Sequence, residues 1–100
     1  MLVKPLMFED FIDKVGHVFA ISEQNFPAIP LILAEAEPLR GVRNKPGIRP
    51  PFSLVFHAPD PRVLPQRLYR LEHNGMGALT IFLVPIGKDA TGVSYQATFN

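Results

Sequence analysis

The sequence predicts a small, mainly β domain, with six antiparallel strands in a barrel or strongly curled sheet and one short N-terminal helix. Apolar and polar residues alternate with a period of two through several short segments, which is typical of strands with one buried face. Eleven prolines spread over 100 residues end these segments early and argue against long helices. Hydrophobic residues make up 47% of the chain, so it can bury one core, and its length suits a single domain over residues 1–100.

The first predicted element is the helix, over residues 7–15. Its apolar side chains recur at intervals of three and four residues, which places them on one helical face. Gly16 supplies a stop signal at the C-terminal end. The apolar residues of this stripe are Phe8, Phe11, Ile12 and Val15.

Beyond the helix the period changes to two, and six strands are predicted. Breaker-rich segments separate them, and the Asn-Gly pair at 74–75 indicates a tight hairpin turn. We expect the third and fourth strands to pair with each other as a hairpin. The predicted strands are 17–22, 28–37, 52–57, 67–73, 78–86 and 93–99.

Matching apolar faces predicts the register of the last three strands. A three-residue loop at Asn74–Met76 and a longer turn after Pro85 bring the large apolar side chains to one face, which is the arrangement that fixes register when one face is buried. The predicted opposite pairs are Leu71 with Leu79, Tyr69 with Ile81, Leu83 with Tyr95, Ile81 with Ala97, and Leu79 with Phe99.

The fifth strand is apolar on both faces, because Phe82, Val84 and Ile86 alternate with the residues of the predicted core. Such a strand needs a cover on each side. The helix could supply the second cover, either on that face or as a plug at one end of a barrel, and a second copy of the protein is the alternative. These three residues, or a sheet edge left open, form the candidate partner-binding surface.

The segment 38–51 contains four prolines and no acidic residue, so it is predicted to be a loop. It holds four of the ten basic residues, which are candidates for binding an anion or nucleic acid. The formal net charge of +1 and the lack of an aromatic residue in the loop count against a nucleic-acid partner. The candidate anion-binding residues are Arg40, Arg43, Lys45 and Arg49, with a second, fainter cluster at Arg62, Arg67 and Arg70.

No catalytic motif is found, and we predict no catalytic residue, metal or cofactor. The three histidines show no spacing typical of metal ligands, and His57 and His73 are expected at opposite ends of one strand pair, with His17 elsewhere. Glu35 and Glu37 share a strand face, but no third group is placed to shift their pKa values, which favours a solvated strand end. The serines Ser22, Ser53 and Ser94 have no marked base beside them.

The composition also limits the cellular compartments in which we expect the protein. With no cysteine the chain has no disulfide or thiolate chemistry, which fits a reducing compartment. The N-terminal stretch "MLVKPLMFEDFIDK" lacks the apolar core of a signal peptide, and the longest apolar run is too short to span a bilayer. We expect a cytoplasmic protein with no membrane partner.

Several segments resemble a family of small bacterial proteins known only as a domain of unknown function. They are "PFSLVFHAP", "LPQRLYRLEH", "GMGALTIFLVPIG" and the terminal "YQATFN". The resemblance covers essentially the whole chain and supplies no catalytic residue. The resemblance implies genes that often neighbour those of phage tail-collar or tail-fibre-like proteins, and therefore a tail-associated accessory module.

Within these segments, Gln66 and His73 are the polar residues of most interest. We expect them to bond free backbone groups where strands diverge, although either could line a binding groove.

The leading hypothesis is therefore a non-enzymatic module that binds another protein, either itself or a tail-fibre-like protein. The alternative is an anion- or nucleic-acid-binding module that uses the basic loop 40–49, and a small hydrolase ranks third.

Overall fold

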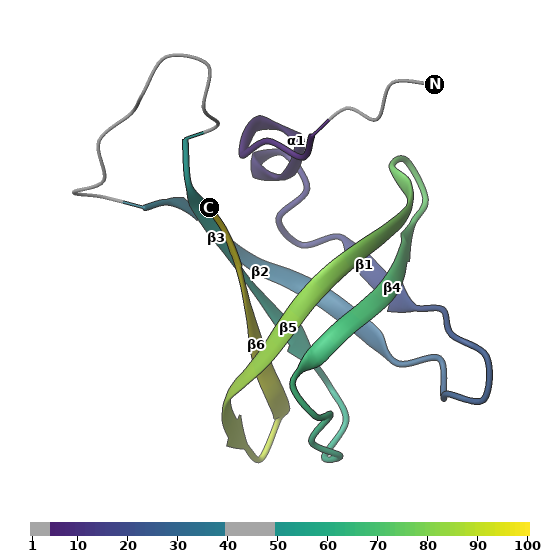
Figure 1. The fold of residues 1–100 in the computed structure, drawn as a ribbon. Helices are drawn as coiled ribbons and strands as arrows, with labels where there is room; N and C mark the ends of the chain where they lie inside the picture. The colour runs from purple at the N-terminus through teal and green to yellow at the C-terminus, as the bar shows by residue number, and fades with distance from the viewer. Residues whose placement is uncertain (1–4, 40–49) are drawn as a thin grey trace.

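The computed structural model describes residues 5–39 and 50–100, and it contains one short helix and six antiparallel strands (Figure 1). The strands close into a barrel in the order β1-β2-β3-β6-β5-β4, which confirms the predicted fold class. The elements are α1 (Glu9–Ile12), β1 (Val18–Ile21), β2 (Pro30–Pro38), β3 (Phe52–Ala58), β4 (Arg67–His73), β5 (Gly77–Asp89) and β6 (Gly92–Phe99).

Alternation along each strand fills the barrel with apolar side chains. In β3, Phe52, Leu54 and Phe56 are fully buried while the residues between them are partly exposed. Tyr69 and Leu71 of β4 point into the same core. Removing these groups from water is the dominant favourable term in folding and explains why the strands hold this face inward.

The helix α1 is shorter than the predicted 7–15. The N–H of Ile12 bonds to the carbonyl of Phe8 at 3.1 Å, but the neighbouring bonds span only three residues. The chain then turns because Gly16 has φ +93° and donates its N–H to the carbonyl of Leu33 at 2.7 Å, which directs the chain towards β2.

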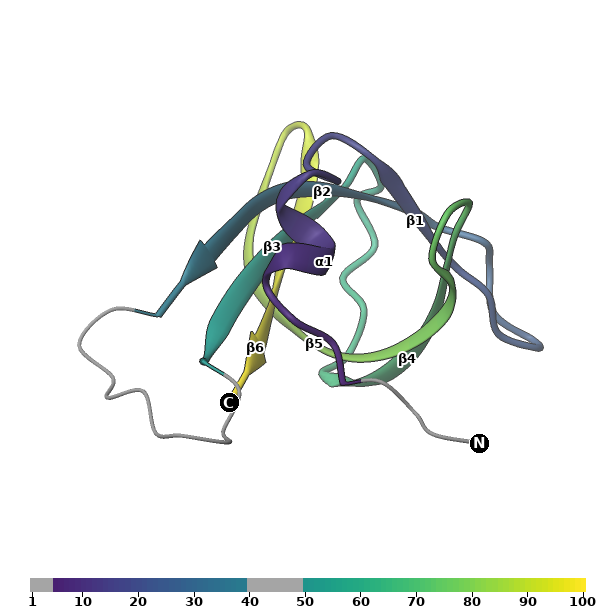
Figure 2. The same cartoon turned by 90° about the horizontal axis from the view of Figure 1, so that it is seen from above.

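Of the two positions predicted for the helix, the structure shows the plug. Phe11 is fully buried at one end of the barrel, where its ring meets those of Phe19, Phe52 and Phe99. Seen from above, α1 lies over the opening of the ring of strands (Figure 2). Ile12 and Val15 of the predicted stripe remain exposed, so α1 does not use them to cover the outer face of β5.

The predicted pairing of the third and fourth strands is wrong. β3 pairs with β2 and β6, whereas β4 pairs with β1 and β5. The proline-rich segment 59–66 between β3 and β4 instead spans the other end of the barrel. Leu64 is buried there, and its N–H donates to the phenol oxygen of Tyr95 at 2.9 Å.

The β4–β5 register is as predicted, with Tyr69 opposite Ile81 and Leu71 opposite Leu79. The β5–β6 register is wrong by two residues, because Pro85, and not Leu83, lies opposite Tyr95. The predicted six-residue turn does not form: β5 continues to Asp89, past an irregularity between Pro85 and Gly87. A shift of two residues keeps every side chain on its predicted face.

Candidate functional site

The outer face of β4 and β5 carries a group of exposed apolar side chains. Leu68 lies directly opposite Phe82, and their side chains are 57% and 45% exposed. Val84 is partly exposed further along β5, and Ile86 is 52% exposed beside the irregularity in that strand. These four residues, Leu68, Phe82, Val84 and Ile86, are called the β4–β5 face below.

The structure brings the three predicted partner-binding residues to this face and adds a fourth. Ile81 and Leu83 point into the core, so Phe82 and Val84 point outward. Leu68 was not among the predicted residues, although it alternates with the predicted core residues of β4. The signal that identifies it is the β4–β5 register, which sets it opposite Phe82.

An ion pair of opposite charges borders the β4–β5 face. Arg70 and Glu72 follow Leu68 on the outward side of β4, with a guanidinium nitrogen 3.7 Å from a carboxylate oxygen. Both side chains are more than half exposed, so the pair itself adds little stability. Its chemical effect is to place both signs of charge beside an apolar patch.

The four predicted anion-binding residues, Arg40, Arg43, Lys45 and Arg49, lie outside the described residues. All three arginines of the second cluster have a carboxylate partner, and Arg62 and Arg67 are held more closely than Arg70. Arg62 binds Asp60 through a nitrogen–oxygen contact of 2.6 Å, and this guanidinium lowers the pKa of Asp60 to about 2. Arg67 binds Glu23 through both terminal nitrogens and lies 4.2 Å from the centroid of the Tyr69 ring. The second cluster therefore offers Arg70, beside Glu72, as its least engaged cation.

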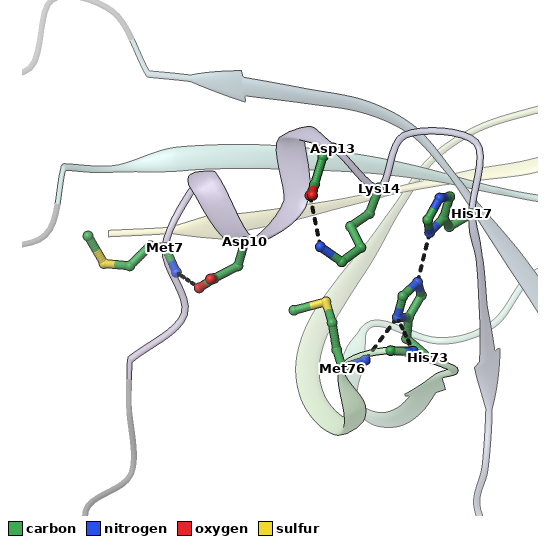
Figure 3. Close-up of polar contacts among 8 residues, drawn as sticks. Met7, Asp10, Asp13, Lys14, His17, His73 and Met76 are labelled. Atoms are coloured by element: carbon green, nitrogen blue, oxygen red, sulfur yellow. Dashed lines mark hydrogen bonds and ion pairs between the residues drawn. The ribbon is translucent and has the colours of Figure 1, made fainter.

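Two histidines that were expected apart lie together. Nδ1 of His17 is 2.9 Å from Nε2 of His73 (Figure 3). Barrel closure explains this, because β1 pairs with β4 through Ala20 and Glu72. The expectation was wrong because it placed His73 on a β3–β4 hairpin, and strand alternation alone does not reveal which strands close the ring.

His73 has the structural role that was expected of it. Its Nδ1 accepts the N–H groups of Gly75 and Met76, each at 3.0 Å, and so holds the turn between β4 and β5. Burial lowers the pKa of His73, and the charges of His17 and Lys14 add to this effect. Gln66 is exposed, and no hydrogen bond of its side chain to another described residue is seen.

The remaining polar candidates form no hydrogen-bonded group within the described residues, although Glu37 lies opposite Ser53 and His57 lies opposite Ser94. Glu35 and Glu37 are both exposed on β2, opposite Val55 and Ser53 respectively. Within residues 5–39 and 50–100, the hydroxyl groups of Ser22, Ser53 and Ser94 form no hydrogen bond with a histidine or carboxylate. His57 uses Nε2 for the carbonyl of Thr91 at 3.1 Å.

The described part of the chain shows neither a metal-binding cluster nor a membrane-spanning helix. There, no three histidine, aspartate or glutamate side chains are grouped as a metal ion would require. Among the same residues, no helix has the length and apolarity to cross a membrane.

Residues 6–99 match the family described as "Domain of unknown function (DUF6916)". The chain belongs to the DUF6916 family. The match spans all six strands and α1, so the family corresponds to the barrel with its helical plug. No curated protein and no solved structure matches this DUF6916 chain.

Proposed function

We propose that this DUF6916 protein is a non-enzymatic interaction module that self-associates through the β4–β5 face. The resemblance noted from the sequence adds a setting to this proposal: the assembled module would act as an accessory of a phage-tail-like structure in the bacterial cytoplasm. The observation that carries the proposal is the exposure of Leu68 and Phe82 side by side, with Ile86 exposed further along β5, on a surface that α1 leaves uncovered.

Apolar area supports an interface at this face. Single exposed apolar residues are ordinary on a protein surface, but a contiguous group is a mark of an interaction site. Leu68 and Phe82 are direct cross-strand neighbours, and Val84 continues the same outward row of β5. Covering such side chains contributes roughly 25 cal/mol for each Å² removed from water.

Charge supports a second copy of the chain as the occupant. A two-fold symmetric interface uses the same patch on both subunits, so the patch must be complementary to itself. Arg70 and Glu72 supply this, since each can face the opposite charge of the partner copy while the two apolar groups meet. A patch rimmed by one sign of charge would repel its own copy.

The test compares two double variants by light scattering over a dilution series. Phe82→Ser with Ile86→Ser removes the β4–β5 face, and Ile12→Ser with Val18→Ser removes two side chains of similar exposure elsewhere. We expect wild type and the Ile12/Val18 variant to gain mass with concentration and the Phe82/Ile86 variant to stay monomeric.

Two results would contradict self-association at this face. Wild type could remain monomeric throughout the series, in which case binding of a purified tail-fibre-like protein that depends on Phe82 and Ile86 would identify the other occupant. Alternatively, both variants could associate as wild type does, which would place the interface elsewhere.

Anion or nucleic-acid binding by the basic loop is the second candidate function. Its support is the concentration of Arg40, Arg43, Lys45 and Arg49 within ten positions. If it holds, salt-dependent retention on heparin would be lost when these four residues are changed to serine, because displaced counterions drive such binding. Self-association through the β4–β5 face would survive that change.

A further inference from the structure

The hydrogen bond between His17 and His73 joins two parts of the chain that are distant in sequence. His17 lies between α1 and β1, and His73 is the last residue of β4. Their ring planes differ by 4°, and the bonded nitrogens are 2.9 Å apart (Figure 3). The bond therefore connects the end of the barrel that α1 plugs to the tip of the β4–β5 hairpin.

The hydrogen-bond partners fix the position of each proton. Nδ1 of His73 accepts two N–H groups, from Gly75 and Met76, so this nitrogen carries no proton. The proton of a neutral His73 ring is then on Nε2, which donates to Nδ1 of His17. Nδ1 of His17 must in turn be unprotonated, so the chain of bonds requires both rings to be neutral.

The surroundings of the pair disfavour a positive charge on His73. The residue is 7% exposed, and its ring lies 4.5 Å from the centroid of Phe19 on β1. Lys14, two residues beyond the end of α1, adds a positive charge, while Asp13 opposes it. Residues 74–80, the turn and the start of β5, contain no titratable side chain, and Arg70 and Glu72 lie on the opposite face of β4.

We propose that His17 and His73 form a pH-sensitive latch that holds the β4–β5 hairpin tip against the α1–β1 junction and opens in mild acid. A proton on Nδ1 of His73 would point at the N–H groups of Gly75 and Met76. A proton on Nδ1 of His17 would point at Nε2–H of His73. Either event places two donors against each other, so the latch is closed only when neither ring is charged.

The direction of the pH effect follows because the latch closes only when both histidine rings are neutral. Burial, and then the charges of His17 and Lys14, hold the pKa of His73 below its ordinary value of 6.5. The latch is therefore closed at neutral pH and opens as the pH falls below that value. Opening separates His73 from Phe19 and frees Met76 to leave its position beside the core. The latch is independent of whether the β4–β5 face binds a partner.

The test is a pH titration of the wild-type protein by nuclear magnetic resonance. Long-range nitrogen–proton correlations of the rings report the tautomer, and amide signals of Gly75 and Met76 report the turn. We expect the His73 ring, whose pKa is lowered by burial, to carry its proton on Nε2 at neutral pH. We also expect the turn amides to shift in acid with the same midpoint as the His73 ring, below 6.5. An ordinary midpoint for His73, or turn amides that stay unchanged through it, would overturn the latch.

Two variants test whether the titration of His73 is coupled to His17 or whether their contact is only structural. His17→Gln keeps an acceptor for Nε2–H of His73 but removes the second ionisable ring. The midpoint of His73 and of the turn amides should therefore move to higher pH, because a like charge is lost. His57→Gln, whose ring bonds only to Thr91 among the described residues, should leave that midpoint unchanged. His17 is exposed, so the fold should tolerate its replacement by glutamine. If the titration midpoint of His73 did not move in His17→Gln, the coupling between the two rings would be overturned.

Discussion

Glu23 and Arg67 form an ion pair across the seam of the barrel, where β1 and β4 share only two residue pairs. Beyond those pairs, the carboxylate of Glu23 accepts the N–H of Arg70 at 2.7 Å, in place of a strand partner. Arg67 also donates to the carbonyl of Leu68 at 2.7 Å. Side chains thus continue the pairing that the short strand β1 cannot supply.

Removing the carboxylate of Glu23 should weaken this seam. Glu23→Ala removes the acceptor of the Arg70 N–H and leaves the Arg67 guanidinium with only the Leu68 carbonyl, and we expect the free energy of unfolding to fall by about 1–2 kcal/mol. Urea unfolding measures this change. Glu35→Ala is the matched control, because this exposed carboxylate bonds to no other described residue. Equal stabilities of the two variants would contradict the role given to Glu23.

The phenol of Tyr95 should stabilise the crossing segment 59–66. Tyr95→Phe leaves the buried N–H of Leu64 without an acceptor, and we expect a loss of about 1–3 kcal/mol in the free energy of unfolding. Proteolysis should also become faster within residues 59–66 than elsewhere. A variant as stable and as resistant as wild type would show that the segment is held by packing alone.

Two glycines of the β5–β6 hairpin should differ sharply in their tolerance of a methyl group. Gly92 has φ +138°, and a Cβ there would lie 1.9 Å from the carbonyl oxygen of Ala58, so Gly92→Ala should cost more than about 3 kcal/mol or prevent folding. Gly87 has nothing within 4 Å of such an atom, and Gly87→Ala should change stability by less than about 1 kcal/mol. Thermal unfolding measures both, and similar losses would contradict the backbone approach at Gly92.

Asp60 should titrate in strong acid. The Arg62 guanidinium lowers its pKa from 3.8 to about 2, so the contribution of this pair to stability is complete above pH 3.8 and is lost as the pH falls towards about 2. A carboxyl carbon titration by nuclear magnetic resonance gives the value directly. Arg62→Ser should return it towards 3.8, and an ordinary value in wild type would contradict the ion pair.

Alternation of apolar residues was enough to predict the strands, their inward faces and the outward row Phe82–Val84. The tight turn after His73 also fixed the β4–β5 register, because local turn chemistry and face matching agreed there. These features depend on residues that are near in sequence, so one sequence was enough to predict them.

Features that depend on barrel closure could not be predicted in this way. The pairing of β4 with β1 brings His17 to His73 and Glu23 to Arg67, and no periodicity in the sequence marks either contact. The β5–β6 register failed by two residues because strand pairing continues past the irregularity at Pro85, where a turn was expected. Because the register error is an even number of residues, the side chains still lie on their predicted faces.

Chemical cross-linking between single cysteines tests the proposed self-association most directly, since the chain contains no cysteine of its own. Thr80→Cys places a thiol on β5 opposite Arg70, beside the β4–β5 face, and Thr98→Cys places one at an exposed position of β6, opposite Ser53. With a short bifunctional maleimide, we expect covalent dimers from Thr80→Cys, lost on adding Phe82→Ser, and few from Thr98→Cys. Equal cross-linking at the two positions, or none at Thr80, would contradict the central claim.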